Sequence, residues 1–385
     1  MRDNLVYLDY NATTPIDPRV AEAIMPFLTD EFGNPSSTHA YGVASRAALL
    51  RARSQVADLV NAANDAIVFV GSGSEADALA IRGAVLAAKQ KGRERPHVVT
   101  QVTEHPAVLA ACQELEELHG VTVTYLPVDS CGSVNPSDVA AAISPDTVLV
   151  TIMHSNNEIG TIQPIAEIAA IAHAHGALMH TDAAQSIGKI PVNVKVLGVD
   201  LLTIVGHKMY APKGIAALYV RPGITLRPII GGGGQEFGLR AGTENVAFAV
   251  ALGEAAELAG KAIRAGEQKR LTELRDRLAS LLQSSLPGLV HINGHPTDRL
   301  PNTLNVRIDG VPALRLLPSL HTVAASAGSA CHAGTDEPSA VLTAIGLTPV
   351  DALCAIRLSI GRWTTEQEID RAAFDITNAA KVMLS

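Results

Sequence analysis

Helical and strand patterns alternate along the chain from about residue 45 to residue 220. The strand patterns are short apolar runs, and the helical patterns between them are longer and amphipathic. Such alternation predicts a mainly parallel sheet covered by helices, and continuous apolar strands fit a sheet that is buried on both faces. The sequence therefore predicts an α/β fold. We expect strands at 66–70, 98–102, 121–128, 147–153, 177–181, 201–205 and 216–220.

The last third of the chain has a different pattern. A glycine-rich stretch at 231–234 is followed by a long helical pattern over 245–286, which Gly266 interrupts. Beyond it, short strands alternate with helices, and this predicts a smaller α+β domain. We expect its strands at 290–293, 302–308, 322–326 and 356–360.

The composition argues against several classes of protein. The net charge of −8 and the 3% aromatic content do not suit nucleic-acid binding, which needs a basic surface and stacking rings. No apolar run approaches the ~20 residues of a membrane span, and the first residues lack a signal-peptide pattern, so we expect a cytoplasmic protein. The cysteines have neither metal-ligand nor C-x-x-C spacing, which argues against a zinc finger or a disulfide framework. They are Cys112, Cys131, Cys331 and Cys354.

Polar or glycine-rich segments follow five of the predicted strands. Ligands of open α/β sheets bind beyond the carboxyl ends of the strands, so we expect a site there. The glycine and serine residues at 71–74 lead into a helix, whose free N–H groups suit a phosphate, although a plain strand-to-helix turn is the alternative. The five segments are 71–75, 104–105, 154–158, 182–185 and 206–208.

Three side chains in these segments have functional and structural interpretations. Asp182 ends an apolar strand, where a carboxylate needs a cationic partner such as a protonated ring nitrogen, and a helix N-cap is the alternative. Lys208 also ends an apolar strand, where a desolvated amine forms Schiff bases, and a surface lysine is the alternative. His105 is either a catalytic or a structural histidine.

Two residues in the last part of the chain also suggest chemistry. Cys331 lies in a run of small residues, 325–335, which is unsuited to a core but suits a thiol that reaches a substrate; an incidental exposed cysteine is the alternative. The neighbouring His332 would favour its thiolate. Arg357 lies within an apolar strand, where it would bind a substrate carboxylate or form an internal ion pair.

Taken in order, these segments resemble cysteine desulfurases of the NifS/IscS type. Those proteins are class V, fold-type I enzymes that depend on pyridoxal 5'-phosphate (PLP). The resemblance covers nearly the whole chain, and the motifs agree in both order and spacing. The matching segments are 8–15, 33–37, 104–105, 154–160, 182–185, 206–208 and 240–243.

The resemblance implies a role for each matching position around the PLP ring. Lys208 would hold PLP covalently, and Asp182 would pair with the pyridinium nitrogen so that the ring remains an electron sink. His105 would stack on the ring and take part in proton transfer. Gln185 would bond the phenolic oxygen, and Asn157 would line the same site.

The resemblance also implies how the phosphate and the substrate would be held. Arg357 would bind the substrate carboxylate, with Asn34 near it. Cys331 would attack the substrate sulfur. The phosphate would be held by Gly73, Ser74 and His207, with Thr243 reaching in from a second subunit.

The implied reaction converts L-cysteine to L-alanine. The sulfur would pass to Cys331 as a persulfide and then to an acceptor protein of an iron–sulfur cluster or thiolation pathway. The implied architecture is a large PLP-binding domain at 15–258, with a mainly parallel seven-stranded sheet, and a small domain formed by 1–14 and 259–385. A homodimer is implied, with no nucleic acid or membrane as partner and no metal site.

Some positions depart from the desulfurase pattern. Val205 stands where many of these enzymes have a serine, which removes one hydrogen bond to the phosphate, and His332 replaces the usual Thr or Ser. The segments 203–208, 242–245 and 330–332 are similar to selenocysteine lyases, so L-selenocysteine remains an alternative substrate.

A class V aminotransferase is a further alternative, but it gives Cys331 no role. A non-enzymatic binding protein on the same fold would contain no bound PLP.

Overall fold

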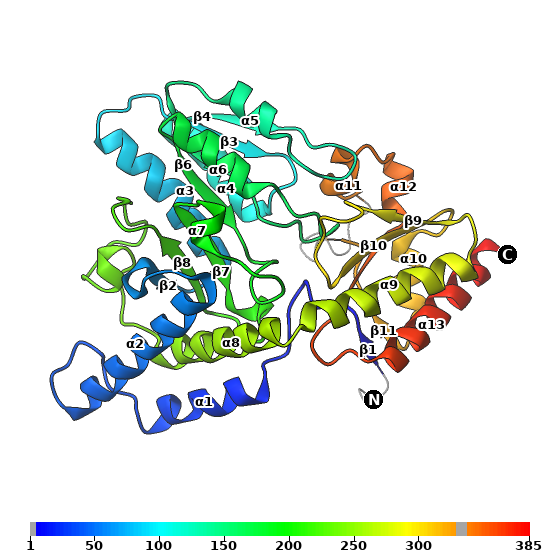
Figure 1. Cartoon of the computed structure of the whole chain (residues 1–385), viewed down its shortest axis with the longest axis horizontal. Helices are drawn as coiled ribbons and strands as arrows, with labels where there is room; N and C mark the ends of the chain where they lie inside the picture. Colours follow the sequence, from blue (N-terminus) through cyan, green and yellow to red (C-terminus); the bar gives the residue numbers. More distant parts are fainter. Residues whose placement is uncertain (1–4, 329–336) are drawn as a thin grey trace.

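The computed structural model describes residues 5–328 and 337–385. Within this part, a seven-stranded sheet has the strand order β2-β8-β7-β6-β5-β3-β4 (Figure 1). Its neighbours are parallel from β4 to β7, whereas β8 runs antiparallel to both β7 and β2. The predicted α/β fold with a mainly parallel sheet is therefore confirmed. The strands are β2 (Ile67–Val70), β3 (His97–Gln101), β4 (Thr122–Leu126), β5 (Thr147–Thr151), β6 (Leu178–Asp182), β7 (Leu201–Val205) and β8 (Ala216–Val220).

Helices cover both faces of this sheet. Successive side chains of β2 point to opposite faces, so Ile67 and Phe69 join one hydrophobic core and Val68 and Val70 join another. The first core is completed mainly by α1, α2, α6 and α8, and the second by α3 and α4. The helices are α1 (Pro18–Thr29), α2 (Ala40–Val60), α3 (Gly73–Gln90), α4 (Pro106–His119), α5 (Pro136–Ala142), α6 (Ile165–Ala174), α7 (Val194–Leu197) and α8 (Val246–Arg264).

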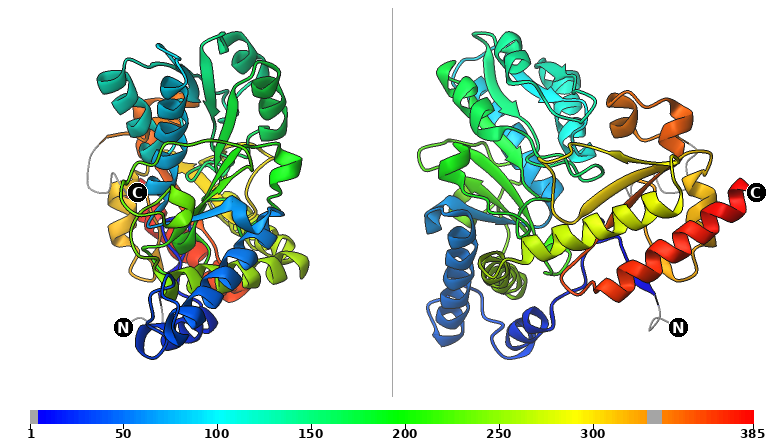
Figure 2. Two further views of the ribbon diagram at one scale, coloured as in Figure 1. Left: turned by 90° about the vertical axis from the view of Figure 1, so that its left-hand side faces the viewer. Right: turned by 45° about the vertical axis from the view of Figure 1, so that its right-hand side comes forward.

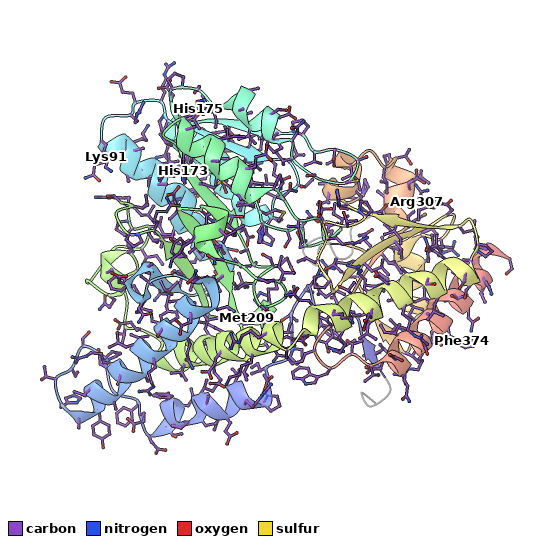
Figure 3. All side chains as sticks on the ribbon, in the orientation of Figure 1. Lys91, His173, His175, Met209, Arg307 and Phe374 are labelled. Atoms are coloured by element: carbon purple, nitrogen blue, oxygen red, sulfur yellow. The ribbon has the colours of Figure 1, made fainter. Side chains whose placement is uncertain are left out.

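A smaller antiparallel sheet, of order β12-β10-β9 in the described residues, forms the second part of the molecule. Helices α9 and α13 pack beside each other on it (Figure 2). Phe374 lies on the outer side of α13 (Figure 3). The elements are α9 (Glu267–Ser285), β9 (Val290–Asn293), β10 (Thr303–Ile308), α10 (Ala313–Ser319), α11 (Ala340–Ala344), α12 (Pro349–Leu353), β12 (Ala355–Ser359) and α13 (Glu366–Leu384).

One predicted strand differs from the structure. Among the described residues, the segment 322–326 is connected to the other three strands of the tail only by an isolated bridge between Ser326 and Arg357. Its strand is reduced to β11 (Val323–Ala324). It pairs in parallel with β1 (Val6–Tyr7) instead. The physical reason is that the start of the chain supplies its hydrogen-bond partners, a pairing that local sequence patterns do not reveal.

Local sequence explains where the elements near the strand ends begin. The side chain of Ser72 accepts a hydrogen bond from the Glu75 N–H and caps α3. Pro106 occupies the first turn of α4, where its missing N–H is tolerated. Gly266 adopts φ 83° between α8 and α9, so the predicted break is confirmed. Strand β5 ends at Thr151, before the predicted residue 153, because the Met153 N–H bonds a side chain, Glu104, rather than a neighbouring strand.

A third hydrophobic core joins the start of the chain to its last third. It combines Val6 and Leu8 with residues of α9, β10, β12 and α13. The division of the chain at residues 15 and 259 stays a prediction, and residue 259 falls inside α8. No helix in the described part of the chain is both long and apolar enough to span a bilayer.

Candidate active site

A cavity of about 390 Å³ lies at the carboxyl ends of the large-sheet strands. Its size falls within the range of about 300–1,000 Å³ that is common for small-molecule sites. Asn11 and Ala12 close it from the start of the chain, and Arg357 reaches it from β12. Nine of the residues predicted from the sequence line it: Gly73, Ser74, His105, Asn157, Asp182, Gln185, His207, Lys208 and Arg357.

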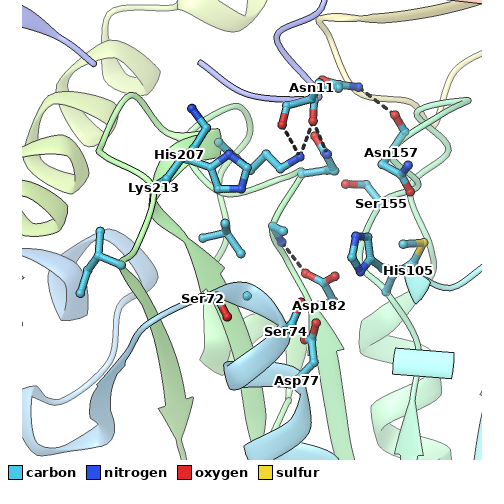
Figure 4. Close-up of a pocket in the computed structure, with 18 of the residues that line it drawn as sticks. Asn11, Ser72, Ser74, Asp77, His105, Ser155, Asn157, Asp182, His207 and Lys213 are labelled. Atoms are coloured by element: carbon cyan, nitrogen blue, oxygen red, sulfur yellow. Dashed lines mark hydrogen bonds between the residues drawn. The ribbon is translucent and has the colours of Figure 1, made fainter. Parts of the chain in front are cut away.

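The N-terminus of α3 forms one end of the cavity. In the part of the chain that the structure describes, the backbone N–H groups of Gly73 and Ser74 donate to no acceptor, as expected for the first turn of a helix. Val205 packs against Gly73, where an added Cβ would lie 2.7 Å from a Val205 methyl group. Figure 4 shows Ser72 and His207 on this side of the cavity and His105 on the other. These N–H groups and the helix dipole suit a phosphate group.

Burial and neighbouring cations control the charge of His207. Its Nδ1 lies 3.1 Å from the Thr13 hydroxyl. Desolvation, followed by the charges of Lys208 and Lys213, lowers the pKa of His207 to about 4. The imidazole is therefore neutral at pH 7 and acts at the cavity as a hydrogen-bonding group.

A buried carboxylate forms the floor of the cavity. Asp182 accepts a hydrogen bond from the Ala184 N–H at 2.8 Å, and it forms no ion pair with any described residue. Burial raises the pKa of Asp182, and its interactions with His105, the Ala184 N–H and Lys208 partly oppose this. Asp77 lies beside it in the cavity wall (Figure 4), and burial also raises the pKa of that carboxyl. A carboxylate this deeply buried suits a protonated ring nitrogen as its partner.

Lys208 reaches the cavity from the short turn after β7. Its Nζ donates to the Asn11 carbonyl at 2.5 Å and to the Ala12 carbonyl at 3.0 Å. The next residue, Met209, is buried in the large core and anchors the turn (Figure 3). The lysine amine is therefore held by carbonyl oxygens on the side of the cavity that faces the start of the chain.

His105 is held by the helix that follows it. Its Nδ1 accepts a hydrogen bond from the Ala107 N–H at 3.2 Å, which assigns the proton of the neutral ring to Nε2. Desolvation lowers the pKa of His105, and the Lys208 charge lowers it further against the opposing effect of Asp182. A neutral histidine with Nε2 available suits proton transfer near neutral pH.

The structure confirms the internal ion pair as one of the two interpretations of Arg357, and binding of a substrate carboxylate stays a prediction. It is buried and forms an ion pair with Asp9, with 2.7 Å between Nη2 and Oδ1. Its Nη1 donates to the Asn157 carbonyl at 3.1 Å, whereas its buried Nε has no partner among the described residues. The guanidinium is thus fixed in place at the cavity wall with donor capacity left for a carboxylate.

Two predicted residues do not line the cavity, and a third lies outside the described residues. The side chain of Asn34 accepts from the Ser36 N–H at 2.9 Å in the exposed segment between α1 and α2. Thr243 is exposed and lies away from this cavity. Cys331 falls outside the described residues.

Sequence reasoning missed Asn11, which connects the two parts of the molecule. Its carbonyl accepts from Lys208 and from the Gln185 amide. Its side chain donates to the Thr303 hydroxyl at 2.8 Å and to the Asn157 carbonyl at 3.1 Å. The only signal in the sequence was its place in the matching segment 8–15.

A second cavity, of about 760 Å³, adjoins the first and shares Asn157 with it. Its walls come from α4, α10, α11 and α12. Gly328 and Glu337, the described residues on either side of 329–336, both line it. The chain therefore enters and leaves the segment containing Cys331 at a cavity beside the candidate active site.

Glu104 lies in the wall of this second cavity. Its Oε1 accepts from the Met153 N–H at 2.7 Å, and its buried Oε2 has no partner in the described part of the chain. Burial raises the pKa of Glu104 from 4.5 to about 8. Since the folded pKa exceeds the unfolded one, the free energy of unfolding falls as the pH rises from 4.5 toward 8.

We expect Glu104→Gln to remove this pH dependence, because an amide keeps an acceptor for Met153 but does not ionise. Relative to the unmodified protein, the variant should gain about 2 kcal/mol in unfolding free energy between pH 6 and pH 8. Urea unfolding at both pH values measures the gain. Glu117→Gln, on the exposed side of α4, is the control. If the variant and the unmodified protein differ in unfolding free energy by the same amount at pH 6 and pH 8, the pKa of Glu104 is not raised into this range.

Comparisons with known proteins agree with this geometry. The chain matches the family model for aminotransferase class-V over residues 6–372. A cysteine desulfurase from a Nostoc species is 49% identical over 96% of this chain and 91% of its own length. The cysteine desulfurase of Mus musculus is 45% identical over 96% of this chain and 80% of its own.

Solved structures show the same similarity. A NifS-like protein superposes with a TM-score of 0.89 at 34% identity and covers 100% of both chains. A structure described as SspA in complex with cysteine has a TM-score of 0.82 at 37% identity, covering 93% of this chain and 99% of its own. The chain belongs to the aminotransferase class V family, whose members depend on PLP. Within that family it belongs with the cysteine desulfurases.

Proposed function

We propose that the chain is a PLP-dependent cysteine desulfurase that converts L-cysteine to L-alanine and transfers the sulfur to Cys331. The observation that carries the proposal is the similarity to cysteine desulfurases at 45–49% identity over nearly the whole chain. The cavity supports it because it brings Lys208, Asp182 and His105 together.

The residues of the cavity fit PLP. The unpaired N–H groups of Gly73 and Ser74 suit its phosphate, and the buried carboxylate of Asp182 suits its ring nitrogen. The amine of Lys208 would attach it covalently. When bound, PLP would supply an electron sink that stabilises negative charge on the substrate carbon that bears the amino group. Thr243 of a second subunit would complete the phosphate site in a homodimer.

Side chains of the cavity would bind the substrate and move its protons. Arg357, held by Asp9, would bind the substrate carboxylate and thereby orient the amino acid. His105 would move protons through Nε2. Asp182 would keep a proton on the ring nitrogen by pairing with it.

Cys331 would take the sulfur. Its thiolate attacks the substrate sulfur, a sulfur–sulfur bond forms, the carbon–sulfur bond breaks, and its electron pair passes to the carbon, which is then protonated. Cys112 and Cys354 are buried, and burial raises the pKa of both thiols, so neither suits this role. A thiolate of a sulfur-acceptor protein would then attack the outer sulfur of the persulfide, which forms a persulfide on the acceptor and returns Cys331 to its thiolate.

The test is product analysis with the PLP-loaded protein. L-cysteine, L-selenocysteine and L-serine are supplied separately with a thiol reductant, and alanine is measured together with sulfide or selenide. We expect alanine and sulfide in equal amounts from L-cysteine and no alanine from L-serine. Selenide release with no turnover of L-cysteine would identify a selenocysteine lyase instead. Amino-group transfer to a keto acid without sulfide would identify an aminotransferase.

A further inference from the structure

A second lysine lies directly behind the candidate active site. Lys189 follows Gln185 by four residues, in the turns that continue from β6. Its Nζ donates to Gln185 Oε1 at 2.8 Å and lies 3.4 Å from Asn11 Oδ1. Both acceptors are amide oxygens of residues that line the cavity.

The surroundings of Lys189 are unusual for a lysine. No carboxylate of the described residues forms an ion pair with it. The charged or titratable groups that face it are Lys208, Arg357 and His207, and none of them is acidic. Burial, and then the charges of Lys208 and Arg357, lower the pKa of Lys189 well below its usual value. Lys189 is half-buried, and among the described residues its amine is bonded to amide oxygens rather than to a carboxylate.

The contact determines which way the amide of Gln185 points. Lys189 donates to Gln185, so the oxygen of the amide, not the nitrogen, faces it. The nitrogen of Gln185 then points the other way and donates to the Asn11 carbonyl at 3.0 Å. A primary amide has two N–H groups, and the second has no acceptor among the described residues. It remains available to a ligand in the cavity.

We propose that Lys189 is a positioning residue that fixes Gln185 with its N–H groups toward the cavity, so that Gln185 donates to an anionic oxygen of the bound cofactor. The inference rests on the proposed function, because the oxygen in question is the phenolic oxygen of PLP. Lys189 itself does not touch the cofactor. It acts through the amide of Gln185, which it orients and polarises.

The bound cofactor reports this arrangement through its visible absorbance. A donated hydrogen bond stabilises the anionic oxygen and lowers the pKa at which the bound cofactor loses its proton. Without Lys189, Gln185 loses its fixed orientation and that pKa rises. The direction of this pKa change is the same whether Lys189 is an ammonium or a neutral amine, because both donate to Gln185.

The experiment titrates the absorbance of the PLP-loaded protein with pH. We expect Lys189→Met to raise the pKa of the bound cofactor by about 0.5–1 unit, the size of one hydrogen bond. Lys195→Met removes an exposed lysine of α7 by the same substitution and should leave the titration unchanged. Lys189→Arg keeps a donor-only side chain and should restore most of the wild-type value.

A double variant separates positioning from a direct effect of charge. In a Gln185→Ala background, Lys189→Met should cause no further shift. A full shift in that background, or no shift in the wild-type background, overturns the proposal. If Lys189→Met does not fold, Lys189→Gln takes its place. A glutamine side chain can donate or accept a hydrogen bond, so it does not fix the orientation of Gln185. An unchanged titration of the bound cofactor in Lys189→Gln then overturns the proposal.

The same measurement keeps this inference apart from the proposed function. A wild-type protein that shows no visible absorbance with PLP overturns both. A wild-type protein that binds PLP and releases sulfide, with an unchanged titration in Lys189→Met, overturns only the role of Lys189.

Discussion

Replacing Lys208 by alanine is expected to lower L-cysteine turnover by on the order of 10⁴-fold or more, as for loss of a group that bonds covalently during the reaction. Lys208 Nζ lies at the cavity, within reach of the Asn11 and Ala12 carbonyls. Alanine supplies no amine, so the protein has no covalent attachment for PLP and no amine to exchange with the substrate. Alanine formation from L-cysteine measures the loss.

A second readout distinguishes this role from misfolding. After borohydride reduction, PLP should remain bound to the wild-type protein in denaturant but not to Lys208→Ala. Lys195→Ala removes an exposed lysine and should retain both turnover and attachment. Covalent attachment that survives in Lys208→Ala would place the reactive amine elsewhere, and Lys189 would then be the residue to examine.

Replacing Cys331 by alanine is expected to reduce sulfide release and protein-bound persulfide to the level found without enzyme. An alanine side chain has no thiolate to attack the substrate sulfur, so no group accepts the sulfur when the carbon–sulfur bond breaks. The described residues that flank its segment, Gly328 and Glu337, line the cavity next to the active site. The visible absorbance of bound PLP should not change, because no residue assigned to PLP is altered.

Cys131→Ala is the matched control for this prediction. Cys131 is a half-exposed thiol, and it should be replaceable with no loss of turnover. Wild-type turnover in Cys331→Ala would contradict sulfur transfer to Cys331.

The strand ends were the most predictable part of the site. Adjacent parallel strands place their carboxyl ends at one edge of the sheet, so residues that follow different strands meet there. This is why His105, Asp182 and Lys208 could be grouped from the sequence before their distances were known. Their roles as the groups that hold PLP came from the family resemblance, and the variants proposed above test them.

Other features were not predictable in the same way. The antiparallel neighbours β2 and β8 are separated by about 150 residues of chain, and β11 pairs with β1 across more than 300. Asp9 and Arg357 meet across an equally long separation. Local patterns of hydrophobicity contain no information about which distant segments will pair.

The sequence by itself determined the α/β class, most of the strands and the set of reactive side chains. Those properties follow from local hydrophobic periodicity and from residue chemistry at strand ends. Only the tertiary structure decided that Asn11 closes the cavity, that Arg357 is already paired with Asp9, and that Lys189 faces Gln185 without a carboxylate. These contacts depend on packing the two parts of the chain together, because burial removes water as the alternative partner and leaves each polar group only the neighbours that the fold provides.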